Sequence, residues 1–451
     1  MKIAIQSQPS DSAVIRELLS PWNVSFTEPE EAEVSIVYRQ KPAEAKSAVV
    51  IPSEASCFKT WARKAFLNVA IKPGILVPVT ATSHTTLTVT PEKRYCFDGS
   101  AKTIFDENSA TDVELEEDTV VLKLDVVQEY KAIVDGTLNP KQSKLHRVVT
   151  GLPIPYGLAP KRLRDFLMKA NNGPENLTLW NKLPTDALRF TLVNAIEKAS
   201  GKEIEKKPIF CNNYICILTH DVETAQGLQR ASLIKKIEEK YDARSAWYVP
   251  SHRFKLNDDT IRELANNGEL GAHDTKHDGK LAHLPKQKIV ERVSDAKQTL
   301  GKIVQRSVDG FRAPILQHNP TILQALSEAG YTYDTSIPTW EPKHPYTMKP
   351  HGIGTVFPLN LNGLTEIPLT LPQDHQLLHV LGLKPEEVLK TWAVKASVIR
   401  DLGGVCMFLV HPDYELGNGS TELYEELVSA VTGDPQATVT VPSRIGTLMN
   451  E

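Results

Sequence analysis

Two short stretches of the sequence place carboxylates and histidines directly after apolar runs. The stretch "ILTHDVET" at residues 217–224 carries Asp221 and Glu223, and "GAHDTKHDG" at 271–279 carries His273 and His277. In a strand, side chains at positions i and i+2 point to the same side, so Asp221 and Glu223 can face one cavity. Two carboxylates this close repel each other unless a basic side chain or a cation lies between them.

The two histidines are four residues apart, which brings imidazoles together on the first turn of a helix or in a tight loop. Two neutral imidazoles and one carboxylate leave a coordination position open, an arrangement typical of a catalytic divalent ion. Such ligands suit zinc, cobalt, nickel and iron alike. A pair of solvated loop histidines is the alternative interpretation.

Four more polar or aromatic residues follow apolar runs later in the chain: Arg312 in "VDGFRAP", Asp334 and Trp340 in "YDTSIPTW", and His411 in "MFLVHPD". Each has a structural alternative. Arg312 could pair with a surface carboxylate and Asp334 could cap a helix. Trp340 could belong to the core, and His411 could be a buried histidine with its hydrogen bonds satisfied. Because all of them follow strand-like runs, we expect them to surround one barrel mouth together with the first two stretches.

From residue 208 onward, apolar runs alternate with amphipathic helices expected at 228–240, 258–267, 285–304, 319–329, 384–401 and 419–432. Strands that alternate with crossover helices predict βαβ units, a parallel sheet and, when seven or eight units repeat, a barrel. Barrels of this kind build active sites at the carboxyl ends of their strands. The pattern therefore predicts an α/β catalytic domain over residues 208–451.

The preceding residues indicate two other regions. Residues 1–135 give short strand-like runs with helices expected at 12–20 and 54–66, which predicts a small α/β domain of Rossmann-like outline. It contains neither GxGxxG nor a P-loop, so no motif supports nucleotide binding. Residues 136–207 have mainly helical periodicity and are interpreted as a helical connector.

The composition limits the class of protein. The chain has 451 residues, 41% hydrophobic and 24% charged, with a formal net charge of -4, which is typical of a globular protein of two or three domains. Blocks of basic residues are lacking, so we expect no nucleic-acid partner. The start "MKIAIQSQPSDSAVIRELL" lacks the pattern of a secretory signal, and Lys72 and Pro73 interrupt the longest apolar stretch. We therefore expect a cytoplasmic protein without an integral membrane segment.

The five cysteines are scattered and lack CxxC spacing, which argues against a disulfide framework or a thiolate metal site. Cys211 and Cys216 are close enough in sequence to bridge, but buried apolar thiols are the favoured interpretation.

The chain from about 210 to 415 resembles the polysaccharide deacetylase (NodB-homology) domain of carbohydrate esterase family four, in its HDVD-type variant. The resemblance rests on five motifs in the family's order: "HDVE", "HDTKH", "FRAP", "YDTSIPTW" and "LVH". It implies a distorted (β/α) barrel, a seven-stranded variant of the TIM barrel. It also implies a hydrolase that removes N-acetyl groups, sometimes formyl or other amide groups, with a divalent metal that is commonly Zn²⁺; Co²⁺, Ni²⁺ and Fe²⁺ are alternatives.

The resemblance also implies a role for each residue in these motifs. Asp221 matches the general base, and Glu223, His273 and His277 match the metal ligands. Arg312 matches the arginine that orients and charge-balances the base. The remaining counterparts are Asp334 and Trp340, which would line the substrate pocket with Ile315, and His411, which would protonate the leaving amine.

Two residues depart from the family's pattern. Glu223 stands where aspartate is usual, and its additional methylene moves the carboxylate by about 1.5 Å, a large displacement for a metal site. Ile315 stands where many members have tyrosine, which changes the pocket wall but leaves a backbone N–H near the turn able to stabilise an oxyanion.

Four further polar residues lie next to these motifs in the sequence. His220 is expected to pack, since it points away from Asp221, and Asp274 and Asp278 are expected to be solvated loop carboxylates. Asp374 in "PLTLPQDHQ" either reaches the pocket or belongs to a turn.

Three functions follow from these residues. The leading one is a metal-dependent deacetylase of an amino sugar or sugar conjugate, with a carbohydrate as its small-molecule partner. A deformylase or linear-amide hydrolase would need the same metal, base and acid. The third is a barrel that binds a sugar or a partner without catalysis. Glu223 in place of the usual aspartate would then indicate that the activity has been lost.

Overall fold

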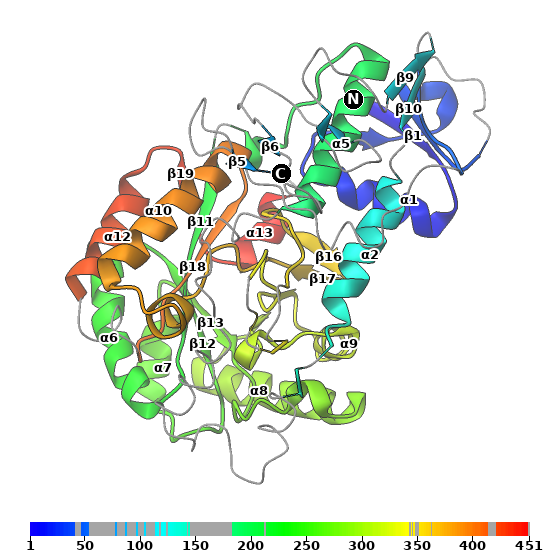
Figure 1. The fold of residues 1–451 in the computed structure, drawn as a ribbon. Coiled ribbons are helices and arrows are strands. Elements are labelled where there is room, and N and C mark those ends of the chain that lie inside the picture. The colour runs from blue at the N-terminus through cyan, green and yellow to red at the C-terminus, as the bar shows by residue number, and fades with distance from the viewer. Residues whose placement is uncertain are drawn as a thin grey trace. The chain divides into compact units, whose positions relative to one another are not determined.

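The computed structural model describes residues 1–40, 47–53, 119–122, 125–141, 143–144, 183–211, 213–341, 344, 346–347, 351–361, 363–413 and 421–449, and the backbone of short strands between 77 and 116. The chain divides into two compact units, one of which holds residues 1–137, 181–211 and 353–355 (Figure 1). The helix predicted at 54–66 and much of the predicted connector lie outside the described residues. The domain limits predicted at 135 and 207 therefore stay predictions.

The first unit contains a six-stranded sheet in the order β2-β1-β3-β4-β10-β9. Its strands are β1 (Lys2–Gln6), β2 (Ser25–Phe26), β3 (Val34–Tyr38), β4 (Ala48–Ile51), β9 (Val113–Glu116) and β10 (Thr119–Leu122). All neighbours are parallel except β9 and β10. The parallel strands thus follow the doubly wound order 2-1-3-4-5 rather than the order of classical dinucleotide-binding domains.

The helices of this unit are α1 (Pro9–Leu18), α2 (Val126–Leu138) and α5 (Pro184–Ser200), with 3-10 turns η1 (Pro29–Glu31) and η4 (Pro208–Phe210). Helix α5 buries Leu188, Leu192 and Ile196, one face at helical spacing, and contacts β3, β4 and β10. Two further strand pairs are β5 (Val77–Pro78) with β6 (Thr86–Leu87), and β7 (Cys96–Phe97) with β8 (Thr103–Ile104).

The second unit is built on a curled nine-stranded sheet. Its strands are β11 (Tyr214–Asp221), β12 (Ser245–Val249), β13 (Glu269–Ala272), β14 (Gly310–Phe311), β15 (Tyr333–Asp334), β16 (Leu359–Leu361), β17 (Leu364–Glu366), β18 (Val405–Leu409) and β19 (Ala437–Val439). Seven of them run parallel in the order β17-β15-β14-β13-β12-β11-β18, while β16 adds an antiparallel edge and β19 pairs with the start of β11. The predicted α/β class and barrel-like sheet are confirmed.

Side-chain and loop contacts connect the two ends of this sheet. Within the described residues, no ladder joins β17 to β18. Instead, the N–H of Met407 donates to Oγ1 of Thr370, four residues beyond β17, at 2.8 Å. The N–H of Val405 donates to the carbonyl of Val356, also at 2.8 Å. The segments on both sides of the β16–β17 pair thereby contact β18.

Helices lie around the outside of the curled sheet (Figure 1). They are α6 (Ala225–Lys240), α7 (Asp258–Ala265), α8 (Lys286–Val304), α9 (Pro320–Glu328), α10 (Pro385–Leu402), α12 (Thr421–Gly433) and α13 (Ser443–Leu448), with short turns η5 (Leu281–His283), η6 (Pro314–Leu316) and η7 (Gln376–Val380). The side chains of Thr224, Asn257 and Asn319 cap α6, α7 and α9 by accepting a backbone N–H two or three residues into each helix. These caps fix where each helix begins after the loop at the carboxyl end of the preceding strand.

The core follows from the burial of the strands. All eight residues of β11 are buried, as expected for a central parallel strand covered on both faces. Cys216 and Cys406 are buried and Cys211 is half-buried, and all three are unpaired thiols. Among the described helices, none combines the length and apolar character needed to cross a membrane.

Candidate active site

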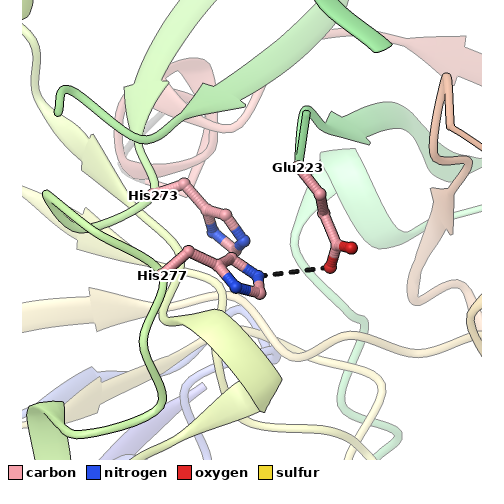
Figure 2. Close-up of side chains that lie close together, drawn as sticks. All are labelled: Glu223, His273 and His277. Carbon is pink, nitrogen blue, oxygen red and sulfur yellow. Dashed lines mark ion pairs between the residues drawn. The ribbon is translucent and has the colours of Figure 1, made fainter. Parts of the chain in front are cut away.

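Glu223, His273 and His277 converge at the carboxyl ends of β11 and β13 (Figure 2). One potential ligand atom from each residue lies within 4.8 Å of those of the other two. Nε2 of His277 lies 3.2 Å from Oε1 of Glu223. The structure thus brings together the three residues predicted to bind a metal.

The ring of His273 is held in one orientation by the backbone. Its Nδ1 lies 2.8 Å from the carbonyl oxygen of Arg312, which can only accept, so Nδ1 carries the proton and Nε2 presents its lone pair. Burial lowers the pKa of His273 to about 4, although the nearby Asp221 carboxylate opposes this shift. The imidazole is therefore neutral, as a metal ligand must be.

The ring of His277 offers a buried nitrogen. Within the described residues, its Nε2 has no hydrogen-bond partner, although the Glu223 carboxylate lies close to it. The residue adopts a left-handed backbone conformation with φ of 52°, and its carbonyl accepts from Nη1 of Arg253 at 3.2 Å. A cation held here would bind Nε2 of His277 and the Glu223 carboxylate together.

Asp221 lies beside these ligands and is 4% exposed. Its Oδ1 accepts from Nη1 of Arg312 at 3.0 Å, and its Oδ2 lies 3.9 Å from Nε2 of His273 and 4.0 Å from Nε2 of His411. Burial alone would raise the pKa of this carboxyl, but the Arg312 guanidinium and the two histidines lower it below its usual value. Asp221 is therefore ionised at neutral pH.

Arg312 is fully buried under the site and has acceptors on several elements. Its Nε donates to Oγ1 of Thr335 at 3.0 Å, and its Nη1 donates to Oγ1 of Thr219 at 2.9 Å as well as to Asp221. The guanidinium carbon lies 4.4 Å from the ring centre of Tyr248. These contacts fix the guanidinium, so Asp221 is held in one orientation.

His411 forms a second charged pair, with Asp374. Nδ1 of His411 lies 2.5 Å from Oδ1 of Asp374, and the backbone N–H of His411 donates to Oδ2 at 2.8 Å. Burial would lower the pKa of His411, but the Asp374 carboxylate raises it to about 10. The sequence left open whether Asp374 reaches the pocket, and the structure places it directly against the histidine.

The turn after Arg312 leaves one backbone donor available. The N–H groups of Ala313, Leu316 and Gln317 all donate within the protein, and Pro314 has none. Within the described residues, no acceptor is found for the N–H of Ile315. Ile315 has φ of 59° and ψ of 22°, a left-handed conformation that is unfavourable for a β-branched residue. This N–H is the candidate for the predicted oxyanion donor.

Asp334 and Trp340, predicted to line the pocket together with Ile315, lie in different surroundings. Asp334 is buried beside Glu366 across the β15–β17 pair, and Ser336 donates to its Oδ1 at 2.6 Å. Burial raises the pKa of both carboxyls. Trp340 is 6% exposed and lies next to Gly352, where an added Cβ would come within 2.5 Å of the tryptophan Cα. Their pocket-lining role stays a prediction.

One expectation about the surrounding loop is wrong. Asp274 is fully buried rather than solvated, and both Asp274 and Asp278 pair with Arg292. His220 packs as expected, stacked on Trp247 with ring centres 4.1 Å apart. It also forms hydrogen bonds that its sequence position did not reveal.

Residues 217–333 match the family model described as polysaccharide deacetylase. The matched segment includes Asp221, Glu223, His273, His277 and Arg312. It ends before Asp374 and His411. The comparison with curated proteins finds no match.

Several solved structures are similar to part of this chain. A protein from Mycobacterium smegmatis, described as a candidate polysaccharide deacetylase, is 18% identical over 53% of this chain and 90% of its own, with a TM-score of 0.45. A probable polysaccharide deacetylase from Pseudomonas aeruginosa PAO1 is 13% identical over 52% of this chain and 91% of its own, with a TM-score of 0.40. A CE4 family pseudoenzyme from Bacillus anthracis is 14% identical over 49% of this chain and 62% of its own, with a TM-score of 0.34. The family model confirms, over residues 217–333, the resemblance to the polysaccharide deacetylase family that the sequence predicted.

Proposed function

We propose that this protein is a metal-dependent hydrolase that removes an N-acetyl group from an amino sugar or sugar conjugate. The observation that carries the proposal is the placement of Asp221 between Arg312 on one side and two histidines, His273 and His411, on the other. An ionised carboxylate, a candidate metal site and a cationic histidine thus meet around one point.

The residues present fit a divalent cation. His273 is neutral with its Nε2 lone pair available, and His277 has a buried Nε2 without a hydrogen-bond partner among the described residues. Glu223 supplies a carboxylate whose side chain is 19% exposed, so the group has access to solvent. Two imidazoles and one carboxylate match a catalytic zinc-type ligand set with an open position.

A divalent ion held there would lower the pKa of a bound water and polarise the amide oxygen. Asp221 accepts the proton of the attacking water, since its carboxylate is ionised and lies next to the ligands. Arg312 keeps this carboxylate oriented through Oδ1, which leaves Oδ2 to face the site.

The later steps use Ile315 and His411. The N–H of Ile315 donates a hydrogen bond to the oxygen that becomes negative as the acyl carbon turns tetrahedral. His411, protonated through its contact with Asp374, gives its proton to the departing nitrogen. The products are acetate and a free amine, which is an amino sugar for an N-acetylated sugar substrate.

The experiment is acetate release from a panel of N-acetylated sugars and nucleotide sugars, with N-formyl compounds and linear amides in parallel. The full-length protein is compared with a His273→Ala/His277→Ala variant. We expect acetate from at least one N-acetylated sugar and none from the variant. Turnover of formyl or linear amides alone would reassign the substrate class, and the absence of all turnover by metal-supplemented protein would favour a binding protein.

A further inference from the structure

Arg292 on α8 joins the two carboxylates that directly follow the proposed metal histidines. Its Nε donates to Oδ1 of Asp274 at 2.5 Å, and its Nη2 donates to Oδ2 of the same carboxylate. On Asp278, Nη2 donates to Oδ1 at 2.8 Å and Nη1 to Oδ2 at 3.2 Å. One guanidinium thus binds two carboxylates, each through both oxygens, the geometry in which arginine gives the most directional ion pairs.

This group of three charges lies mostly out of water. The side chain of Asp274 is fully buried, and those of Arg292 and Asp278 are 13% and 21% exposed. At low exposure such hydrogen bonds are strong, and losing one partner leaves a buried charge without compensation. Because their oxygens are engaged by Arg292, Asp274 and Asp278 are unsuited to act as metal ligands.

The loop that Arg292 holds has an unfavourable backbone. Asp274 has φ of 64° and His277 has φ of 52°, so both occupy the left-handed region, which is uncommon outside glycine although aspartate and histidine adopt it more often than other residues. The carbonyl of Asp274 accepts from the N–H of Ser251 at 3.1 Å, and the N–H of Lys280 donates to Asp278 Oδ1 at 3.1 Å. Within this loop each aspartate contacts Arg292 on α8, while His273 and His277 converge with Glu223.

We propose that Arg292 is a positioning residue of the metal site. It fixes the loop at 273–278 so that His273 and His277 converge before any metal binds. This inference rests on the proposed function, because it concerns the same proposed metal ligands, His273 and His277. Preorganised ligands bind a metal more tightly, since less ordering of the loop accompanies binding.

The test is the metal affinity of the full-length protein and of Arg292→Gln and Arg292→Lys variants. Zn²⁺ affinity is measured by competition with a chelating dye, and the visible absorption of the Co²⁺-loaded protein reports the ligand geometry. We expect Arg292→Gln to weaken Zn²⁺ affinity about 10- to 100-fold and to change the Co²⁺ spectrum. The Zn²⁺ affinity of Arg292→Lys should lie between those of the wild type and Arg292→Gln. Lysine keeps the charge but lacks the planar group that reaches both carboxylates.

The matched control is Arg262→Gln on α7, which removes a guanidinium paired with the exposed Asp258 and Asp259. It should leave Zn²⁺ affinity and the Co²⁺ spectrum unchanged. Asp278→Asn, which removes the less buried half of the contact, provides a milder variant should Arg292→Gln fail to fold. It should weaken Zn²⁺ affinity several-fold.

The outcomes separate this inference from the proposed function. If the wild type binds Zn²⁺ and the folded Arg292 variants bind it equally well with the same Co²⁺ spectrum, Arg292 has no positioning role and the metal site stands. If the wild type itself binds no metal, the metal site and the role of Arg292 are both overturned.

Discussion

Asp221 has the environment that a general base needs. The guanidinium of Arg312 and the neighbouring histidines hold its pKa below the usual value despite its burial. Its second oxygen lies about equally far from Nε2 of His273 and Nε2 of His411. One carboxylate can therefore serve a proton transfer between the proposed metal site and the proposed acid.

Replacing Asp221 by asparagine should remove turnover and leave the metal in place, since the ligand set of Glu223, His273 and His277 is unchanged. We expect kcat to fall about 10²- to 10⁴-fold, the usual contribution of a general base. Acetate release and metal content are measured on the same preparation, with Asp259→Asn as an exposed control. A variant that turns over at the wild-type rate would remove Asp221 from this role.

As the proposed acid, His411 is expected to give the activity its pH dependence in the alkaline range. Its pKa in the folded protein is raised to about 10 by Asp374, so the proton on its ring is present at neutral pH and is lost as pH rises through about 10. The contribution of the His411–Asp374 pair to the stability of the fold also decreases as pH rises. It is fully present below the unfolded pKa near 6.5 and disappears as pH approaches the folded value.

Asp374→Asn should therefore move the alkaline limb of kcat to lower pH, towards the ordinary histidine range. The pH profile of acetate release is compared between the wild type and this variant. A profile whose alkaline limb does not move would show that another group carries the acid role.

The sequence identified the charged side chains of the site because each follows an apolar run. It could not assign Asp374, whose partner His411 lies 37 residues away in the chain, or Arg292, whose partners Asp274 and Asp278 lie 18 and 14 residues away. Hydrogen-bond partners at such separations depend on how strands and helices pack, which periodicity does not specify. For the same reason Asp274 was expected in solvent.

At the scale of elements, the site depends on where strands end. β11, β13, β14 and β18 each deliver one or more of its residues at or just beyond the last strand position. The alternation of apolar runs and helices predicted these strands and placed the helix limits within a few residues, as for α8 and α9. It also indicated strand-like runs at β14 and β15, but not that each strand is only two residues long, because their pairing is set by neighbours in the sheet.

His220 connects β11 to the chain after β18. Its Nδ1 donates to the carbonyl of Val410 at 2.9 Å, and its Nε2 lies 2.8 Å from Oε1 of Glu238. Oxygens of Glu238 also accept from the hydroxyls of Tyr424 and Ser245. His220 thereby holds the segment that precedes His411.

His220→Phe should destabilise the second unit, because the Val410 carbonyl loses its donor and Glu238 loses one contact. We expect the free energy of unfolding to fall by about 1–3 kcal/mol for each buried group left unsatisfied. Urea unfolding followed by tryptophan fluorescence measures this. Glu425→Gln, which removes an exposed ion pair with Lys240, should have a much smaller effect. Equal effects would contradict a structural role for the His220 contacts.

At the scale of the molecule, the candidate metal ligands all belong to the second unit. A ligand that binds only the folded form stabilises it by RT ln(1 + [L]/Kd), about 2.7 kcal/mol at a metal concentration 100 times Kd. Metal should therefore stabilise the unit that contains β11 to β19.

Added chelator should lower the unfolding temperature of this second unit. The same treatment should leave the His273→Ala/His277→Ala variant unaffected. Differential scanning calorimetry with and without chelator tests this. A wild-type transition that does not respond to chelator would argue against a metal bound to the folded chain.

The most direct measurement is the metal content of the purified protein by elemental analysis. The wild type is compared with His273→Ala/His277→Ala and with His375→Ala/His379→Ala. This second pair has the same spacing, with His375 directly before η7 and His379 within it. The proposed site predicts about one divalent ion per chain in the wild type and in the control, and none in the His273→Ala/His277→Ala variant. Equal metal content in all three proteins, or no metal in the wild type after supplementation, would contradict it.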